Sequence, residues 1–322
     1  MSRTMQREQS SPLRFDGRVA LVTGAGQGLG RAYATLLAQR GAKVVVNDLG
    51  TGADGTTSDP ARARAVVDEI QGAGGEAVAN GSSVATPEGA AEMVGAALDA
   101  FGRIDIIINN AGLFAVTPVP DVTPADLQRQ LDVHVHGPLN VCQAAWPHLV
   151  QQGYGRIVVT SSTAIYGSIR SVAYSAAKGG AYGLARALAT AGAEHGITVN
   201  AFGPTAFTPL TRASRGVAAD PVDARVNDLM TEDRVAPAVI ALVHESNTRS
   251  GRFYLAGGGR IVRAFLAETP GWFTEDPTPE DVTEHWADID AEPGYDIPTD
   301  LETQRVRTRG LVYEGHGGAV EA

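Results

Sequence analysis

Lysine and cysteine are scarce in this chain of 322 residues. Two lysines, Lys43 and Lys178, stand against 24 arginines, and the only cysteine is Cys142. A single cysteine excludes a disulfide within the chain and is typical of a reducing compartment, and its apolar helical surroundings predict core packing. Because so few lysines are present, Lys178 in AYSAAKGG is a candidate for a specific role. Lys43 opens an apolar strand and is expected to be an ordinary solvated strand end.

The sequence also lacks an excess of positive charge and a long apolar run. A net charge of −10 argues against a nucleic-acid partner, which requires a basic face. No window approaches the ~18 apolar residues of a membrane span, so no membrane partner is expected. The N-terminal segment has no apolar signal-peptide region, which predicts a cytoplasmic location.

From residue 18 onward, short β-branched runs alternate with longer amphipathic segments. The runs predicted to be strands are residues 18–25, 43–49, 76–83, 104–112, 155–162, 198–204 and 252–258. Several are continuously apolar, as in parallel strands buried on both faces. Between them, Thr86, Pro87 and Gly102 mark the two ends of a helix. The pattern predicts an α/β fold, a doubly wound, Rossmann-like parallel sheet of about seven strands with helices on both faces.

The composition predicts three parts. Residues 1–14 are expected to be a flexible N-terminus, residues 15–262 the catalytic domain, and residues 263–322 a C-terminal extension. The extension is acidic and contains prolines, and it predicts one short helix from Thr278 to about Ile289 followed by a mobile tail. We expect it to pack on its own or a neighbouring subunit of a homodimer or homotetramer.

The segment TGAGQGLG follows the first predicted strand and opens a helix. Gly24, Gly28 and Gly30 allow a tight turn and the approach of a pyrophosphate to the helix N-terminus. Asp48 ends the second strand, where its carboxylate could accept hydrogen bonds from both hydroxyls of an adenosine ribose. A 2′-phosphate would meet like charge there, and no basic residue stands in the glycine turn, where Gln27 sits. The sequence therefore predicts a dinucleotide site that prefers NAD over NADP.

With TGAGQGLG, NNAG and YSAAK in this order, residues 15–262 resemble the short-chain dehydrogenase/reductase superfamily. The resemblance implies an NAD-dependent enzyme that interconverts a secondary alcohol and a ketone by means of a serine, Tyr174 and Lys178. It also implies that the segment 109–112 stabilises the central sheet. The cofactor contacts that it implies are Gly24, Gln27, Gly28, Leu29, Gly30, Asp48, Ser83, Val84, Asn110, Ala111, Gly112, Tyr174, Lys178 and Pro204.

A narrower resemblance is to the (3R)-hydroxyacyl-CoA dehydrogenase domains of type 2 peroxisomal multifunctional enzymes. It rests on VVVNDLG, ALDAFGRIDIIINNAG, VHVHG, YGRIVVTSS and RVAPAVIALVHES, and TPEDVTEHWADI extends it to about residue 290. It implies a small-molecule substrate, a 3-hydroxyacyl-CoA, with a hydroxysteroid or another secondary alcohol as the alternative. No segment similar to a hydratase or sterol-carrier domain follows, so a stand-alone dehydrogenase is expected. A non-catalytic NAD-binding sensor is a different class, which the intact catalytic residues disfavour.

Tyr174 and Lys178 are four residues apart and therefore share one helix face. A unit charge about 4 Å from the phenol, at an effective dielectric near 20, contributes roughly 4 kcal/mol, or about 3 pKa units. The pair thus predicts a Tyr174 pKa near 7, suited to a general acid–base.

The catalytic serine is one of two neighbours. Counting back from Tyr174 by the spacing of the family selects Ser161. Counting forward along the preceding strand selects Ser162. We favour Ser162, because strand register fixes side-chain direction and loops absorb deletions.

Other positions depart from the family pattern. His134 stands where most members have an asparagine whose main chain holds a proton-relay water. Ser83 replaces an aspartate that usually meets the adenine, and Thr205 replaces a glycine after Pro204. No metal site is expected, because His134 and His136 alternate along a helix and do not face one ligand.

Substrate recognition is expected in the loop from Thr205 to about Asn227. Arg212 and Arg215 in this loop could contact the phosphates of CoA. Alternatively, both are ordinary solvated loop arginines.

Overall fold

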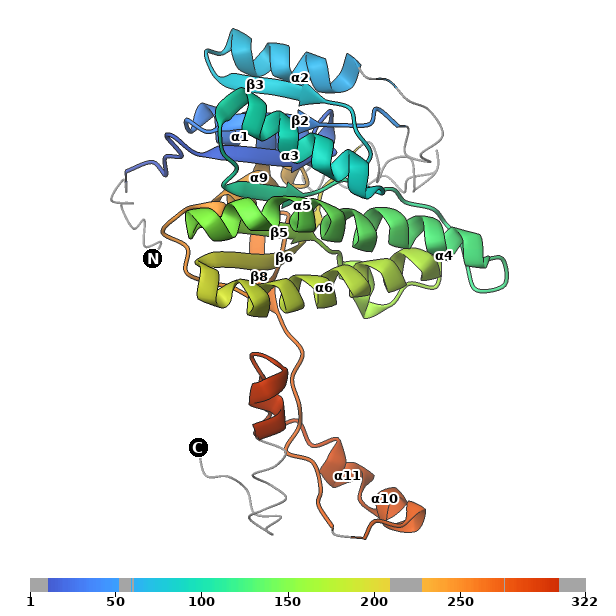
Figure 1. Cartoon of the computed structure of the whole chain (residues 1–322). Coiled ribbons are helices and arrows are strands. Elements are labelled where there is room, and N and C mark those ends of the chain that lie inside the picture. Colours follow the sequence, from blue (N-terminus) through green and yellow to red (C-terminus); the bar gives the residue numbers. More distant parts are fainter. Residues whose placement is uncertain (1–10, 52–58, 60, 209–227, 275, 307–322) are drawn as a thin grey trace, which may run out of the picture. The chain divides into compact units, whose positions relative to one another are not determined.

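The structure is a computed structural model of the chain, and it describes residues 11–51, 59, 61–208, 228–274 and 276–306 (Figure 1). The chain divides into two compact units, residues 1–263 and 264–322. Arg212 and Arg215, with most of the expected substrate loop, lie outside the described residues. The same holds for most of the expected N-terminal segment and for the tail after residue 306.

The first unit is built on one eight-stranded sheet in the order β3-β2-β1-β4-β5-β6-β7-β8. Seven of its strands pair in parallel. The strands are β1 (Val19–Thr23), β2 (Lys43–Asn47), β3 (Glu76–Asn80), β4 (Ile106–Asn109), β5 (Gly155–Thr160), β6 (Ile197–Thr205), β7 (Phe253–Gly257) and β8 (Arg260–Ala264). The predicted doubly wound α/β fold and all seven predicted strands are confirmed.

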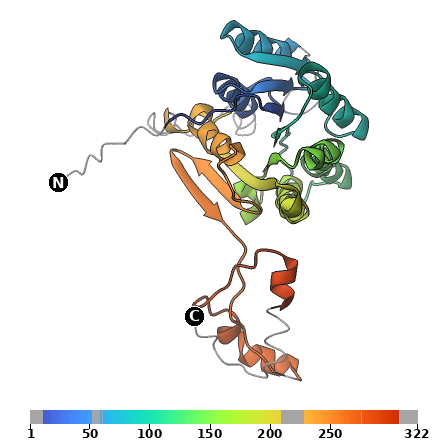
Figure 2. The ribbon, with the colours of Figure 1, turned by 60° about the vertical axis from the view of Figure 1, so that its left-hand side comes forward.

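The eighth strand was not predicted. It follows β7 through a turn at Gly258 and Gly259, whose φ angles of +59° and +80° suit the two central positions of a tight hairpin. Figure 2 shows the two orange strands pointing in opposite directions. In the sequence, the pair of glycines between two apolar runs was the signal that could have predicted this hairpin. Because β8 extends to Ala264, the domain end expected at residue 262 falls inside a strand.

Helices cover both faces of the sheet (Figure 1). They are α1 (Gly28–Gln39), α2 (Ala61–Gly72), α3 (Pro87–Phe101), α4 (Pro124–Leu131), α5 (Gly137–Gln152), α6 (Val172–Gly192) and α9 (Glu232–Val243). Helices α1, α2 and α9 bury side chains such as Leu37 and Val239 against alternate strand residues, among them Val22 and Val46. Helices α3, α5 and α6 pack on the opposite face. No helix in the described part of the chain is long and apolar enough to cross a membrane.

Local capping fixes the ends of α3 as predicted. The hydroxyl of Thr86 accepts a hydrogen bond from the backbone N–H of Gly89 at 3.2 Å, and Pro87 occupies the first turn. Gly102 ends the helix with φ +74°, a left-handed conformation that favours glycine.

In the second unit, the helix predicted from Thr278 to about Ile289 is interrupted. Thr278 caps α10 (Pro279–Glu284), and α11 (Trp286–Ile289) is a separate turn. At the break, the His285 ring stacks on Trp272 with 4.3 Å between centroids and its Nδ1 lies 2.9 Å from a carboxylate oxygen of Asp288. These contacts hold His285 at φ −105°, outside helical geometry, so the prediction of one continuous helix was wrong.

The direction of chain progression across the sheet reverses between β1 and β4. The loops that leave the carboxyl ends of these two strands therefore diverge to opposite sides. Such a switch point opens a crevice where ligands bind in doubly wound folds. Thr23 and Asn109 end the two strands here, so the predicted glycine turn and the NNAG segment meet at this crevice.

Candidate active site

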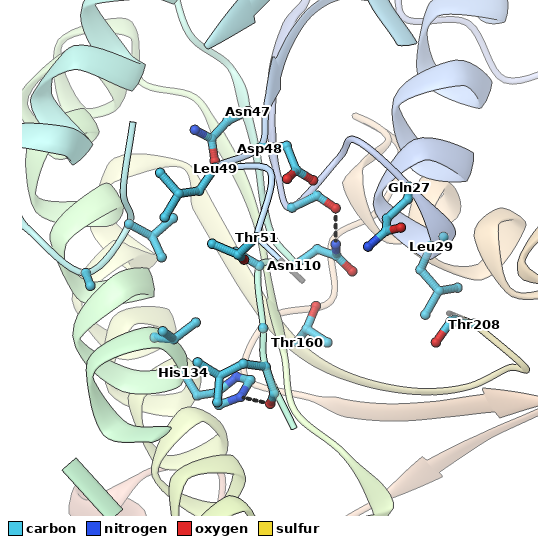
Figure 3. Close-up of a pocket in the computed structure, with 18 of the residues that line it drawn as sticks. Gln27, Leu29, Asn47, Asp48, Leu49, Thr51, Asn110, His134, Thr160 and Thr208 are labelled. Atoms are coloured by element: carbon cyan, nitrogen blue, oxygen red, sulfur yellow. Dashed lines mark hydrogen bonds between the residues drawn. The ribbon is translucent and has the colours of Figure 1, made fainter. Parts of the chain in front are cut away.

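A cavity of about 560 Å³ lies along the carboxyl ends of the strands (Figure 3). Loops after six strands contribute to its wall, as does α6. The predicted cofactor residues on the wall are Gly24, Gln27, Gly28, Leu29, Asp48, Ser83, Val84, Asn110, Ala111, Gly112, Tyr174, Lys178 and Pro204. The structure thus gathers all of these residues except Gly30 around one space.

The glycine turn leaves no room for side chains at two of its positions. Gly24 has φ +63°, and a Cβ there would lie 2.8 Å from the Cα of Ala111. A Cβ on Gly30 would collide with the carbonyl oxygen of Gly24, so Gly30 serves close packing and does not line the cavity. Helix α1 begins at Gly28, and Gln27 provides no side-chain cap. The first N–H groups of this helix have no partner within the helix, which favours an anionic ligand.

Asn110 fastens the glycine turn to the end of β4. Its side-chain amide donates to the carbonyl oxygens of Thr23 and Gly24 at 3.0 and 3.1 Å. In return, the Thr23 hydroxyl accepts from the backbone N–H groups of Asn110 and Ala111, both at 3.0 Å. This network ties the ends of β1 and β4 together beside the cavity.

Asp48 follows the end of β2 and lines the same cavity as residues of α6. Its two carboxylate oxygens accept from the backbone N–H groups of Gly26 and Gly50, each at 2.7 Å. The preceding Asn47 donates to the carbonyl of Ser82 at 2.9 Å and so joins the loops after β2 and β3. The Asp48 side chain is therefore fixed at the edge of the glycine turn.

Tyr174 and Lys178 lie on one face of α6, as predicted, but the lysine does not lower the pKa of the tyrosine. The Lys178 ammonium donates to the carbonyl oxygen of Thr160 at 2.7 Å and lies 5.6 Å from the centre of the Tyr174 ring. Burial raises the pKa of Tyr174, and the side chain of Ser162 offsets this in part. Burial also lowers the pKa of Lys178 to about 7. The predicted Tyr174 pKa near 7 is wrong for this geometry, because desolvation favours the neutral form of both groups.

The two candidate serines point to different partners. The buried Ser161 donates from its hydroxyl to the backbone carbonyl of Lys178 at 2.9 Å. The Ser162 hydroxyl accepts from the backbone N–H of Ala164 at 3.1 Å and interacts with the Tyr174 hydroxyl. Ser161 contributes to the cavity wall, whereas Ser162 approaches the phenol.

His134 is buried beside Tyr174, in a π-helical turn over Asp132–His136 between α4 and α5. Its Nε2 lies 2.9 Å from the carbonyl oxygen of Leu113, and a carbonyl only accepts, so Nε2 carries the proton. Burial and the nearby Lys178 charge lower the pKa of His134 well below its usual value, which keeps the imidazole neutral. The rings of His134 and Phe114 both meet Tyr174 edge-on, at 5.3 and 5.0 Å between centroids. The two rings fix the orientation of the phenol.

Several wall residues were missed by sequence reasoning. Asn47 and Ser82 stand at strand ends, where a polar residue is a usable signal. Arg62 and Thr51 also line the cavity. Arg62 comes from the first turn of α2, and its spacing in the sequence gave no indication that it would reach the glycine turn.

Residues 18–220 match the family model for the short chain dehydrogenases. The chain belongs to this family. The short-chain dehydrogenase is 42% identical over 274 residues to a Mycobacterium tuberculosis protein described as a short-chain type dehydrogenase/reductase, with 84% of this chain and 93% of that protein covered.

Two solved structures are similar to this short-chain dehydrogenase. Full-length peroxisomal multifunctional enzyme type 2 from Drosophila melanogaster matches with a TM-score of 0.78 and 32% identity, over 95% of this chain and 51% of that enzyme. A 7α-hydroxysteroid dehydrogenase in complex with NADH and 7-oxoglycochenodeoxycholic acid matches with a TM-score of 0.68 and 29% identity, over 76% and 95% of the two chains. The chain spans about half the length of the multifunctional enzyme. These similarities identify it as an oxidoreductase acting on CH–OH donors.

The lowered pKa of Lys178 predicts a pH-dependent stability. Between pH 7 and 10.5 the folded state binds fewer protons at this site than the unfolded chain, so the free energy of unfolding rises with pH. The slope from this group is at most about 1.4 kcal/mol per pH unit. We expect Lys178→Met to be more stable than the native chain near pH 6, with the difference shrinking toward about pH 10. Urea denaturation across this range tests it, with Lys43→Met as the control. A difference that does not change with pH would contradict the prediction.

Proposed function

We propose that this protein is an NAD-dependent dehydrogenase that interconverts a 3-hydroxyacyl-CoA and the corresponding 3-oxoacyl-CoA. The observation that carries the proposal is one cavity lined by Tyr174, Lys178 and Asp48. The similarity to the type 2 multifunctional enzyme supports an acyl-CoA substrate. The similarity to the 7α-hydroxysteroid dehydrogenase favours the alternative, a hydroxysteroid.

The residues around the cavity fit a dinucleotide. A Cβ on Gly24 or Gly26 would lie 2.8 Å from Ala111 or Asp48, so both glycines allow the turn to pack closely against the two loops that border the cavity. The N-terminus of α1 would hold the pyrophosphate, and Asp48 would accept hydrogen bonds from the adenosine ribose. When bound, NAD accepts the hydride in alcohol oxidation and returns it in ketone reduction.

Tyr174 would exchange a proton with the substrate oxygen. Because burial raises the pKa of its phenol, the hydroxyl is protonated at neutral pH and can donate to a developing alkoxide during ketone reduction. Ser162 would donate a second hydrogen bond to the same oxygen. Lys178, whose pKa is about 7, can lose and regain its proton at neutral pH, as an arginine cannot. In alcohol oxidation Tyr174 must give up its phenolic proton before it can accept the hydroxyl proton of the substrate, and neutral Lys178 would take up that phenolic proton.

The substrate class is tested by measuring NADH production across a panel of 3-hydroxyacyl-CoAs and hydroxysteroids. Turnover of one or more 3-hydroxyacyl-CoAs above the steroids supports the proposal, and preferred turnover of a steroid supports the alternative.

Tyr174→Phe is the matched control, because it removes the transferable proton and keeps the ring. It should lose turnover while NADH binding persists. A variant that binds NADH and turns over normally would exclude Tyr174 as the acid–base group.

Replacing Ser162 or Ser161 by alanine should reduce turnover to different extents. Removing one donor from a preorganised oxyanion site costs roughly 2.7–4 kcal/mol, or about 100- to 1000-fold in turnover, so Ser162→Ala should lose this much. Ser161→Ala should be much milder in turnover, because its hydroxyl is bound to the backbone of Lys178. Turnover of both variants at saturating NAD is the measurement. A large loss only at Ser161 would reverse the assignment.

Asp48 predicts the cofactor preference. A 2′-phosphate would meet the Asp48 carboxylate, so the native protein should bind NAD much more tightly than NADP. Asp48→Ala should reduce the difference between the affinities for NAD and NADP. Calorimetric titration with both dinucleotides measures these affinities. Equal affinities in the native protein would refute the NAD assignment. A cytoplasmic location and a homodimer or homotetramer remain predictions from the sequence.

A further inference from the structure

Arg62 brings a positive charge to the glycine turn from another part of the chain. It lies in the first turn of α2 and lines the cavity together with Asp48 and Thr51. A Cβ added to Gly26 would lie 2.9 Å from the Cβ of Arg62 and 2.8 Å from the Asp48 carboxylate. Arg62 and Asp48 therefore border the same glycine, although 13 residues separate them in the sequence.

Among the residues that the structure describes, the Arg62 guanidinium has one hydrogen-bond acceptor. Its Nη1 donates to the carbonyl oxygen of Thr51 at 2.9 Å, which anchors the side chain at the cavity wall. A guanidinium carries five N–H donors in a planar fork, and a single carbonyl uses one of them. The remaining donors suit the two oxygens of a phosphate or carboxylate.

The Asp48 carboxylate has a separate anchor. Both of its oxygens accept from backbone N–H groups, those of Gly26 and Gly50. Its position consequently does not depend on Arg62, and the two side chains present opposite charges to the same end of the cavity.

We propose that Arg62 forms a binding site for the 2′-phosphate of NADP, and that Asp48 is the group that closes this site in the native protein. The inference rests on the proposed function, in which the Asp48 end of the cavity holds the adenosine ribose. A 2′-phosphate carries close to two negative charges at neutral pH. It is repelled by the carboxylate and attracted by the guanidinium, so removal of the Asp48 charge leaves a bidentate cationic partner for it.

Calorimetric titration with NAD and with NADP tests the proposal on the native protein, Asp48→Asn, Arg62→Ala and the double variant. Asp48→Asn removes the charge and keeps one oxygen that can accept from the backbone N–H of Gly26 or Gly50, whereas alanine would lose both hydrogen bonds, so asparagine is preferred to alanine where folding is concerned. A hydrogen bond to a charged group contributes enough for about a tenfold or larger change in affinity. We expect Asp48→Asn to bind NADP at least tenfold more tightly than the native protein does. The double variant should lose that gain and bind NADP at least tenfold more weakly than Asp48→Asn does.

Arg64→Ala is the matched control, because Arg64 is an exposed arginine on the same helix. It should leave both affinities unchanged in the native and Asp48→Asn backgrounds. An NADP gain that is equal with and without Arg62 would overturn the inference while the NAD assignment stands. If the native protein binds neither dinucleotide, the proposed function fails and this inference fails with it.

Discussion

The side-chain amide of Asn110 donates to the carbonyl oxygens of Thr23 and Gly24, and this contact joins the ends of β1 and β4 where the sheet order reverses. It demands a close approach, because a Cβ on Gly24 would press on the backbone of Ala111 and one on Gly30 would lie 2.7 Å from the Asn110 amide. With the turn held there, α1 begins at the cavity and its free N–H groups face the space where a pyrophosphate would bind. The part of the cavity beside the glycine turn thus depends on the Asn110 hydrogen bonds between the ends of β1 and β4, and not on the glycine turn alone.

The positions of Tyr174 and Lys178 depend on Thr160 at the end of β5 and on the two serines that follow it. The Thr160 carbonyl holds the Lys178 ammonium, the Ser161 hydroxyl holds the Lys178 backbone carbonyl, and the Ser162 side chain interacts with Tyr174. Successive residues of an extended backbone point to opposite sides, so Ser161 docks α6 against the sheet while Ser162 contacts the Tyr174 phenol. The dipeptide Ser161–Ser162 therefore both docks α6 on the sheet and contacts the Tyr174 phenol.

The sequence was sufficient for features that rest on local periodicity and capping. Seven strands and both ends of α3 followed from apolar runs and from Thr86 and Gly102, and Asp48 followed from its place at the end of a strand. Strand β8 was missed because its residues are half-exposed or exposed and resemble the start of the extension. The pKa of Tyr174 was missed for a different reason. Spacing along a helix gives proximity, but burial and the choice of the Thr160 carbonyl as partner are set by tertiary packing. Arg62 was missed because the approach of α2 to Gly26 is likewise a tertiary contact.

A comparison of two buried cations explains why a chain so rich in arginine keeps a lysine at position 178. Arg156 is also buried, but its Nη1 donates to the carbonyl oxygens of Gly155 and Gly196 and its guanidinium stacks on the Tyr154 ring at 4.2 Å. At position 178, the described residues offer the ammonium one carbonyl acceptor. An arginine there would keep its charge at every ordinary pH with most of its donors unpaired, which is costly in a buried place. A lysine can release its proton when the surroundings do not stabilise it, and its pKa of about 7 places that release in the physiological range. The same burial that makes this position unsuitable for arginine gives Lys178 a proton that can move.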